Sequence, residues 1–124
     1  MSTPKVSVKW LPNPESKDYE AARSYLGLLF AKKPVAKLVG DLENAPVSSF
    51  KAKDIFRASR LPLLPITNSH VATDKKKITS KQKLSPLLLV RDSRNSKLII
   101  ADGYHRMCAV YYFNEDADIP CQIV

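Results

Sequence analysis

Glycine is scarce in this chain, and its scarcity excludes the glycine-rich nucleotide loops. Only 3 of the 124 residues are glycine, while 9 are proline. Walker-type and Rossmann-type phosphate loops need several glycines at fixed spacing, because the backbone must approach the phosphates closely. Neither spacing occurs here. Any phosphate site must therefore use another backbone arrangement.

Cysteine is also rare. Cys108 and Cys121 do not form a Cys-x-x-Cys pair, and no companion His or Cys cluster completes a zinc site. A disulfide between them is one alternative. Because Cys108 falls in a predicted helix and Cys121 in a predicted strand, we expect both thiols to lie reduced in the core. This cysteine usage predicts a cytoplasmic protein.

Long apolar runs are missing as well. The longest, residues 87–90 and 98–101, are far too short to span a bilayer. The N-terminus has no cationic region followed by an apolar run and a cleavage site. We therefore expect no membrane among the partners of this chain.

Positive charge is what the sequence has in excess. The net charge is +8 and the isoelectric point is about 9.6. Such a balance favours anionic partners, which are nucleotides, nucleic acid or an acidic protein. The basic residues are spread along the chain, with one run at residues 75–77. The alternative to an anionic partner, that the charge forms a solvated face and only aids solubility, stays open.

The first half of the chain is predicted to be helical. Residues 1–16 have little periodicity and predict an extended arm, of which the alternating Val6, Val8 and Trp10 could form a strand. Apolar residues recur at helical spacing after this arm. The helices expected from that recurrence and from the proline positions cover residues 17–31, 35–43 and 51–59. In the first of them, Leu28 and Leu29 are expected on the inward face.

The second half has a mixed pattern. Residues 66–83 are polar and basic and predict a loop with a helical turn. The regular elements expected after it are strands at 86–91, 97–101 and 119–124, with a helix at 104–113. The residues expected to form the core between sheet and helix are Leu87, Leu89, Ile99, Ala109, Val110 and Ile119.

The most informative motif is Asp102-Gly103-Tyr104-His105-Arg106, at the junction of a predicted strand and helix. Glycine lets the backbone turn sharply there and approach a ligand closely. The first amides of a helix carry partial positive charge, and His105 and Arg106 add donors beside them. Cations in a first helical turn are unfavourable unless an anion is bound. The motif therefore predicts a compact phosphate site.

This motif resembles the ParB/sulfiredoxin superfamily. Sulfiredoxins carry Gly-Cys-His-Arg here, ParB-type domains Gly-Glu-Arg-Arg, and free serine kinases Asp-Gly-His-His-Arg, which is the nearest pattern. The resemblance covers roughly residues 50–124. It implies an α+β fold, a small mixed sheet with helices, preceded by a helical N-terminal half. We expect one domain over residues 1–124, with residues 1–50 as a helical extension and 51–124 as the motif-bearing core.

The resemblance also implies site roles. His105 and Arg106 would contact nucleotide phosphates, and Gly103 would permit their close approach. Asp102 would orient a metal ion or a hydroxyl group and is the candidate catalytic base, while Tyr104 is placed to stack on a base. Family members add a basic, hydroxyl-bearing turn upstream, for which the candidates are Lys75, Lys77, Thr79 and Ser80.

Structural roles compete with these assignments. Asp102 could simply cap the helix, His105 could bond a carbonyl group, and Arg106 could pair with Asp102. His70 stands in a polar segment without a partner at metal-ligand spacing, so we expect it to be exposed. The cysteine of sulfiredoxin is replaced by Tyr104, which cannot do thiol chemistry, although Cys108 lies one helical turn later.

Three functions follow as hypotheses. The first is nucleotide binding, with a nucleoside triphosphate and Mg²⁺, extending to phosphoryl transfer or nucleotide hydrolysis. The second is a nucleic-acid-binding or nuclease module, suggested by the charge, although no helix-turn-helix or zinc-finger pattern is present. The third is an interaction protein that keeps the fold without its chemistry.

Overall fold

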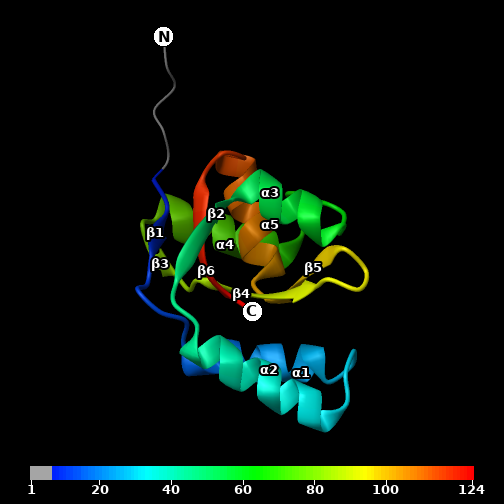
Figure 1. The fold of residues 1–124 in the computed structure, drawn as a ribbon. Coiled ribbons are helices and arrows are strands. Elements are labelled where there is room, and N and C mark those ends of the chain that lie inside the picture. Colours follow the sequence, from blue (N-terminus) through cyan, green and yellow to red (C-terminus); the bar gives the residue numbers. More distant parts are fainter. Residues whose placement is uncertain (1–6) are drawn as a thin grey trace.

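The computed structural model describes residues 7–124 and confirms an α+β architecture (Figure 1). Pro4 and Val6 of the predicted arm lie outside the described residues. The helices are α1 (Ser16–Leu26), α2 (Lys32–Asn44), α3 (Ala52–Ser59), α4 (Ser69–Thr79) and α5 (Tyr104–Phe113). The strands are β1 (Lys9–Trp10), β2 (Ser48–Lys51), β3 (Lys83–Leu84), β4 (Leu87–Asp92), β5 (Lys97–Asp102) and β6 (Asp118–Ile123).

The main sheet has four strands in the order β2-β6-β4-β5. β4 lies in its interior, parallel to β6 and antiparallel to β5, and β2 is antiparallel to β6 at the far edge. β1 and β3 form a separate parallel pair in which Trp10 lies opposite Leu84. The arm therefore does contribute a strand, at residues 9–10.

Helices cover both faces of the main sheet (Figure 1). Leu87 and Leu89 of β4 belong to the core cluster shared with α3, α4 and α5, whereas Leu88 and Val90 pack with α1 and α2. A strand buried on both faces has no polar alternation, which explains the apolar run of β4. All six core residues expected from the sequence are buried, with at most 6% of their surface exposed.

The helical hairpin of α1 and α2 lies under the sheet and confirms that the first half covers one side of the core (Figure 1). The prediction for the end of α1 is wrong, because the helix ends at Leu26 rather than at residue 31. The chain must reverse there so that α2 can bury Val35 and Val39 in the cluster that also holds Leu26. Leu28 and Leu29 therefore lie in an exposed turn.

The prediction of a loop at residues 66–83 is also wrong, because α4 is a regular helix of 11 residues. Asn68 caps it, since its side-chain oxygen accepts hydrogen bonds from the amides of His70 and Val71. Only Val71 and Ile78 are buried apolar residues of this helix, so its apolar stripe is too thin to recognise by periodicity.

The sequence predicts no strand at residues 48–51, yet β2 pairs along β6 with Ser48 opposite Cys121. Most of β2 is exposed, so it carries no buried alternating pattern. Cys108 and Cys121 are free and buried, as expected. Among the described helices, none has both the length and the apolarity needed to cross a membrane.

Candidate functional site

The motif lies where β5 passes into α5. Gly103 precedes the first residue of α5 and has φ of 107°, in the left-handed region that favours glycine. A β-carbon at this position would stand 2.6 Å from Leu87 Cγ and 2.9 Å from Arg106 Nη2. No side chain caps α5, so the amides of its first turn have no side-chain acceptor. Glycine is therefore required here by both conformation and space.

α4 packs beside α5 and brings a second set of polar residues to this junction. His70, Asp74 and Lys77 follow one another at about one helical turn, so they share one side of α4. They line a pocket of about 190 Å³ at the start of α5. The residues that line it are His70, Thr73, Asp74, Lys77, Asp102, Gly103, His105 and Arg106.

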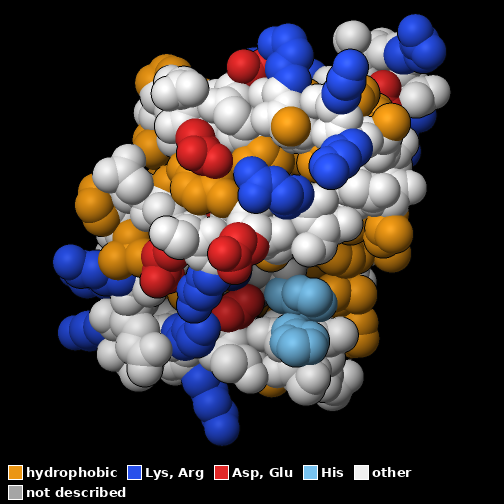
Figure 2. Space-filling model, turned by 90° about the horizontal axis from the view of Figure 1, so that it is seen from below, with side chains coloured by type: hydrophobic (Ala, Val, Ile, Leu, Met, Phe, Trp, Pro, Cys, Tyr) orange, Lys and Arg blue, Asp and Glu red, His pale blue; other side chains and the backbone are white. Residues whose placement is uncertain are grey.

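The two histidines of the chain are neighbours in this pocket. The ring centroids of His70 and His105 are 4.7 Å apart, and Figure 2 shows both at the surface beside acidic side chains. Burial lowers the pKa of His105, and the nearby His70 lowers it further. Both effects favour the neutral imidazole, which can donate one hydrogen bond and accept another.

Asp74 occupies a position on the inner stripe of α4 and is only 9% exposed. Its nearest cation is Lys77, whose Nζ lies 3.9 Å from Asp74 Oδ1. Burial raises the pKa of Asp74, while the charges of Lys77 and Arg106 oppose that shift. A buried carboxylate whose nearest cation is 3.9 Å away costs stability, and its place in a pocket makes Asp74 a candidate functional residue.

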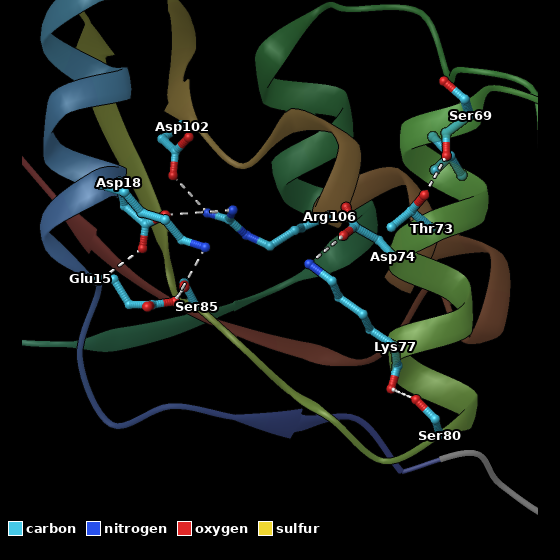
Figure 3. Close-up of polar contacts among 12 residues, drawn as sticks. Glu15, Asp18, Ser69, Thr73, Asp74, Lys77, Ser80, Ser85, Asp102 and Arg106 are labelled. Atoms are coloured by element: carbon cyan, nitrogen blue, oxygen red, sulfur yellow. Dashed lines mark hydrogen bonds and ion pairs between the residues drawn. The ribbon is translucent and has the colours of Figure 1, made fainter.

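Arg106 is held by two carboxylates. Its Nη2 donates to Asp102 Oδ2 at 2.8 Å, and its Nη1 lies 3.8 Å from Asp18 Oδ1 (Figure 3). Nη2 also lies 3.4 Å from the carbonyl oxygen of Pro86. Burial raises the pKa of Asp102 despite the opposing charge of Arg106. The alternative in which Arg106 pairs with Asp102 is thus what the structure contains.

Asp18 joins the N-terminal hairpin to the motif. Its Oδ2 accepts a hydrogen bond from the amide of Glu15 at 2.8 Å, as part of the capping box of α1. The Glu15 carboxylate in turn accepts from the hydroxyl of Ser85 at 3.0 Å. Residues far apart in sequence therefore form one connected polar network around Arg106 (Figure 3).

Several predicted site residues lie away from the pocket. Lys75 extends over the ring of Phe113, with its Nζ 5.5 Å from the ring centre. The hydroxyls of Thr79 and Ser80 donate to backbone carbonyls within α4, at 3.0 and 3.2 Å. Tyr104 packs against the core, and its hydroxyl donates to the carbonyl of Pro62. Of the four upstream candidates, only Lys77 lines the pocket.

Sequence reasoning missed His70, Thr73, Asp74 and Asp18. The spacing of His70, Asp74 and Lys77 places them on one face of a helix. This was missed because residues 66–83 were predicted to form a loop. Asp74 also interrupts the buried stripe of α4, which is unusual without a function. Asp18 gave no signal of this kind, because an acidic residue in a first turn is common in any helix.

No protein-family model, curated protein or solved structure matches this chain. The residues of the pocket and their chemistry are therefore the basis for a function.

Asp74→Asn should make the protein more stable above acidic pH. Asp74 has a raised pKa in the folded state, so it holds its proton more tightly folded than unfolded. Wild-type stability is therefore lost as pH rises from the ordinary value of 3.8 through the raised pKa, and the neutral amide avoids that loss. Thermal melts from pH 3 to pH 8 measure the difference. A variant that is less stable than wild type at neutral pH would show that Asp74 stabilises the fold.

Proposed function

We propose that the pocket between α4 and α5 binds the phosphoryl group of a nucleotide, as the resemblance to ParB/sulfiredoxin-like domains implies. The observation that carries this proposal is that Lys77 and both histidines line the pocket at the uncapped start of α5. Helix amides with a partial positive charge favour an anion. Lys77 adds a full charge, which is a common way to bind phosphate.

The size of the pocket limits what enters it. Its volume is about 190 Å³, whereas whole small-molecule sites occupy about 300–1,000 Å³. One phosphoryl group with a cation fits these dimensions, and the base would lie outside. Tyr104 is partly buried against the core cluster and its hydroxyl donates to the carbonyl of Pro62, so we do not expect it to stack on the base. We therefore expect ATP, CTP and GTP to bind with similar affinity.

Two carboxylates beside a phosphate call for a cation. Within residues 7–124 no group of three His, Cys, Asp or Glu side chains could hold a metal ion alone. Mg²⁺ commonly uses one or two carboxylates together with phosphate oxygens, so it would enter with the nucleotide. Asp102 is engaged by Arg106 at 2.8 Å, whereas Asp74 has only Lys77 at 3.9 Å. Asp74 is thus the better candidate for metal ligand or base in phosphoryl transfer.

Lys77→Ala should weaken nucleotide binding by about tenfold or more, because one charge-assisted contact to phosphate is lost. Isothermal titration with ATP, CTP and GTP, with and without Mg²⁺, measures this effect. Lys76→Ala is the matched control, since Lys76 is an exposed neighbour outside the pocket and removes the same charge.

The proposal fails if wild-type protein binds none of the nucleotides at about 1 mM, the range of very weak ligands. It also fails if Lys76→Ala and Lys77→Ala weaken binding equally, because the effect would then be one of general charge. The nucleic-acid hypothesis would be favoured if the protein bound duplex DNA with a steep salt dependence and Lys77→Ala bound it as tightly as wild type.

A further inference from the structure

The turn between α1 and α2 exposes an unusual group of apolar side chains, which we call the hairpin tip. Leu28 is 82% exposed and Leu29 is 49% exposed. Phe30 and Tyr25 beside them are 36% and 41% exposed. Single exposed apolar residues are normal on protein surfaces, but four within six positions mark a contact site.

Basic residues surround the hairpin tip. Residues 21–40 contain four cations and no acidic side chain. Arg23, Lys32 and Lys33, here called the basic collar, form no ion pair with any described residue, whereas Lys37 is paired with Asp41. Arg23 and Lys32 also line a hollow of about 340 Å³ beside Phe30. The tip is thus apolar at its end and cationic around its base.

The backbone donors of the turn are already satisfied. The amides of Gly27 and Leu28 donate to the carbonyls of Arg23 and Tyr25, at 3.0 Å each. Those of Leu29 and Phe30 both donate to the carbonyl of Leu26, at 3.0 and 2.9 Å. Moving an N–H group without a hydrogen-bond partner into lipid costs several kcal/mol. The N–H groups of residues 27–30 all have partners, so the turn avoids this cost.

We propose that the hairpin tip docks on the surface of an anionic phospholipid bilayer. Leu28 and Leu29 enter the boundary between headgroups and acyl chains, and the basic collar meets the lipid phosphates. No described helix could cross a bilayer, so this contact is interfacial only. It replaces the expectation of no membrane partner, which rested on the lack of a membrane-spanning segment. The proposal is independent of the nucleotide site, which lies toward the opposite end of α1, near Asp18.

Charge decides against a second copy of this chain as the occupant. Two hairpin tips in contact would bring two basic collars together without acidic residues to pair with them. An acidic protein is the remaining alternative. The tip protrudes as a turn at the end of a helical hairpin, which suits insertion into a fluid surface (Figure 1).

The apolar part is tested by co-sedimentation with vesicles of phosphatidylcholine, with and without phosphatidylserine. The full chain should bind only the phosphatidylserine vesicles. Leu28→Ser with Leu29→Ser should lower the partition coefficient at least about tenfold, because apolar insertion is lost while the charge is unchanged. The matched control is Ile66→Ser with Val47→Ser, two other exposed apolar residues at 47% and 39%, which should bind as wild type.

The basic collar is tested by Arg23→Gln, Lys32→Gln and Lys33→Gln together. Each cation near an anionic surface contributes about fivefold, so binding should fall about a hundredfold. Lys76→Gln, Lys83→Gln and Lys97→Gln remove the same charge elsewhere and should lower binding far less. Equal losses in the two triple variants, or no vesicle binding at low ionic strength, would overturn the proposal. So would a dimer in sedimentation velocity that the Leu28 and Leu29 substitutions dissociate.

Discussion

Arg106→Ala should lower the free energy of unfolding by about 3–4 kcal/mol at neutral pH. The reason is that the buried carboxylates of Asp102 and Asp18 would lose their cationic partner. Arg106 Nη2 lies 2.8 Å from Asp102 Oδ2, and Nη1 lies 3.8 Å from Asp18 Oδ1. These carboxylates would face each other without a cation. Urea unfolding of wild type and variant measures the loss. The motif alone predicts a different result, in which Arg106→Ala removes phosphate binding and leaves the fold intact, and the ion pairs of Arg106 with Asp102 and Asp18 argue against it.

The penalty should depend on pH in a defined direction. Arg106 opposes the rise in the pKa of Asp102, so its removal raises that pKa further. A carboxyl whose pKa is higher in the folded state than in the unfolded state loses stability as pH rises through that window. The difference between Arg106→Ala and wild type should therefore be smallest in acid and largest above the raised pKa.

Two further variants separate charge from packing. Asp102→Asn added to Arg106→Ala should recover part of the stability at neutral pH, because one stranded charge is removed. Arg106→Lys should also recover part, since a lysine keeps the charge but not the planar fork of donors. An Arg106→Ala protein as stable as wild type at neutral pH would show that the network does not support the fold.

Gly103→Ala should cost about 2–4 kcal/mol, from backbone strain at a positive φ together with overpacking. The added β-carbon would stand 2.6 Å from Leu87 Cγ, in the middle of the core. Because Gly103 directly precedes the first turn of α5, nucleotide binding should weaken as well. Chemical unfolding and titration with nucleotide measure the two effects on the same protein.

Gly40→Ala is the matched control. Gly40 lies within α2, and a β-carbon there would meet no atom within 4 Å. Alanine is favoured over glycine inside a helix, so this change should stabilise the protein by about 0.5–1 kcal/mol. If the two substitutions had equal effects, the left-handed conformation and the close packing of Gly103 would not matter for stability.

The elements near the motif could be predicted from sequence because local patterns specify them. β4 is an apolar run that needs burial on both faces, and the polar turn at residues 92–96 returns the chain into β5. Gly103 then ends β5 and begins α5, within a residue of the expected boundary. Residues close together in the sequence determine these elements, which is why the sequence alone predicts them.

Distant contacts decided the rest. α4 has a thin apolar stripe and a charged surface, and it is stable because it packs on α5. β2 exists because β6 supplies its partners. α1 ends at Leu26 because α2 must return along the same face of the sheet.

The sequence by itself determined the α+β class, the core strands and the junction at Gly103, because apolar pattern and backbone freedom are local properties. Only the tertiary structure decided which polar groups meet at that junction. It brought His70 to His105, and Asp18 to Arg106, across 35 and 88 positions of the chain respectively. Such pairings depend on how the helices pack on the sheet. A local sequence pattern shows which residues share a face of one helix, but not which distant polar group that face will contact.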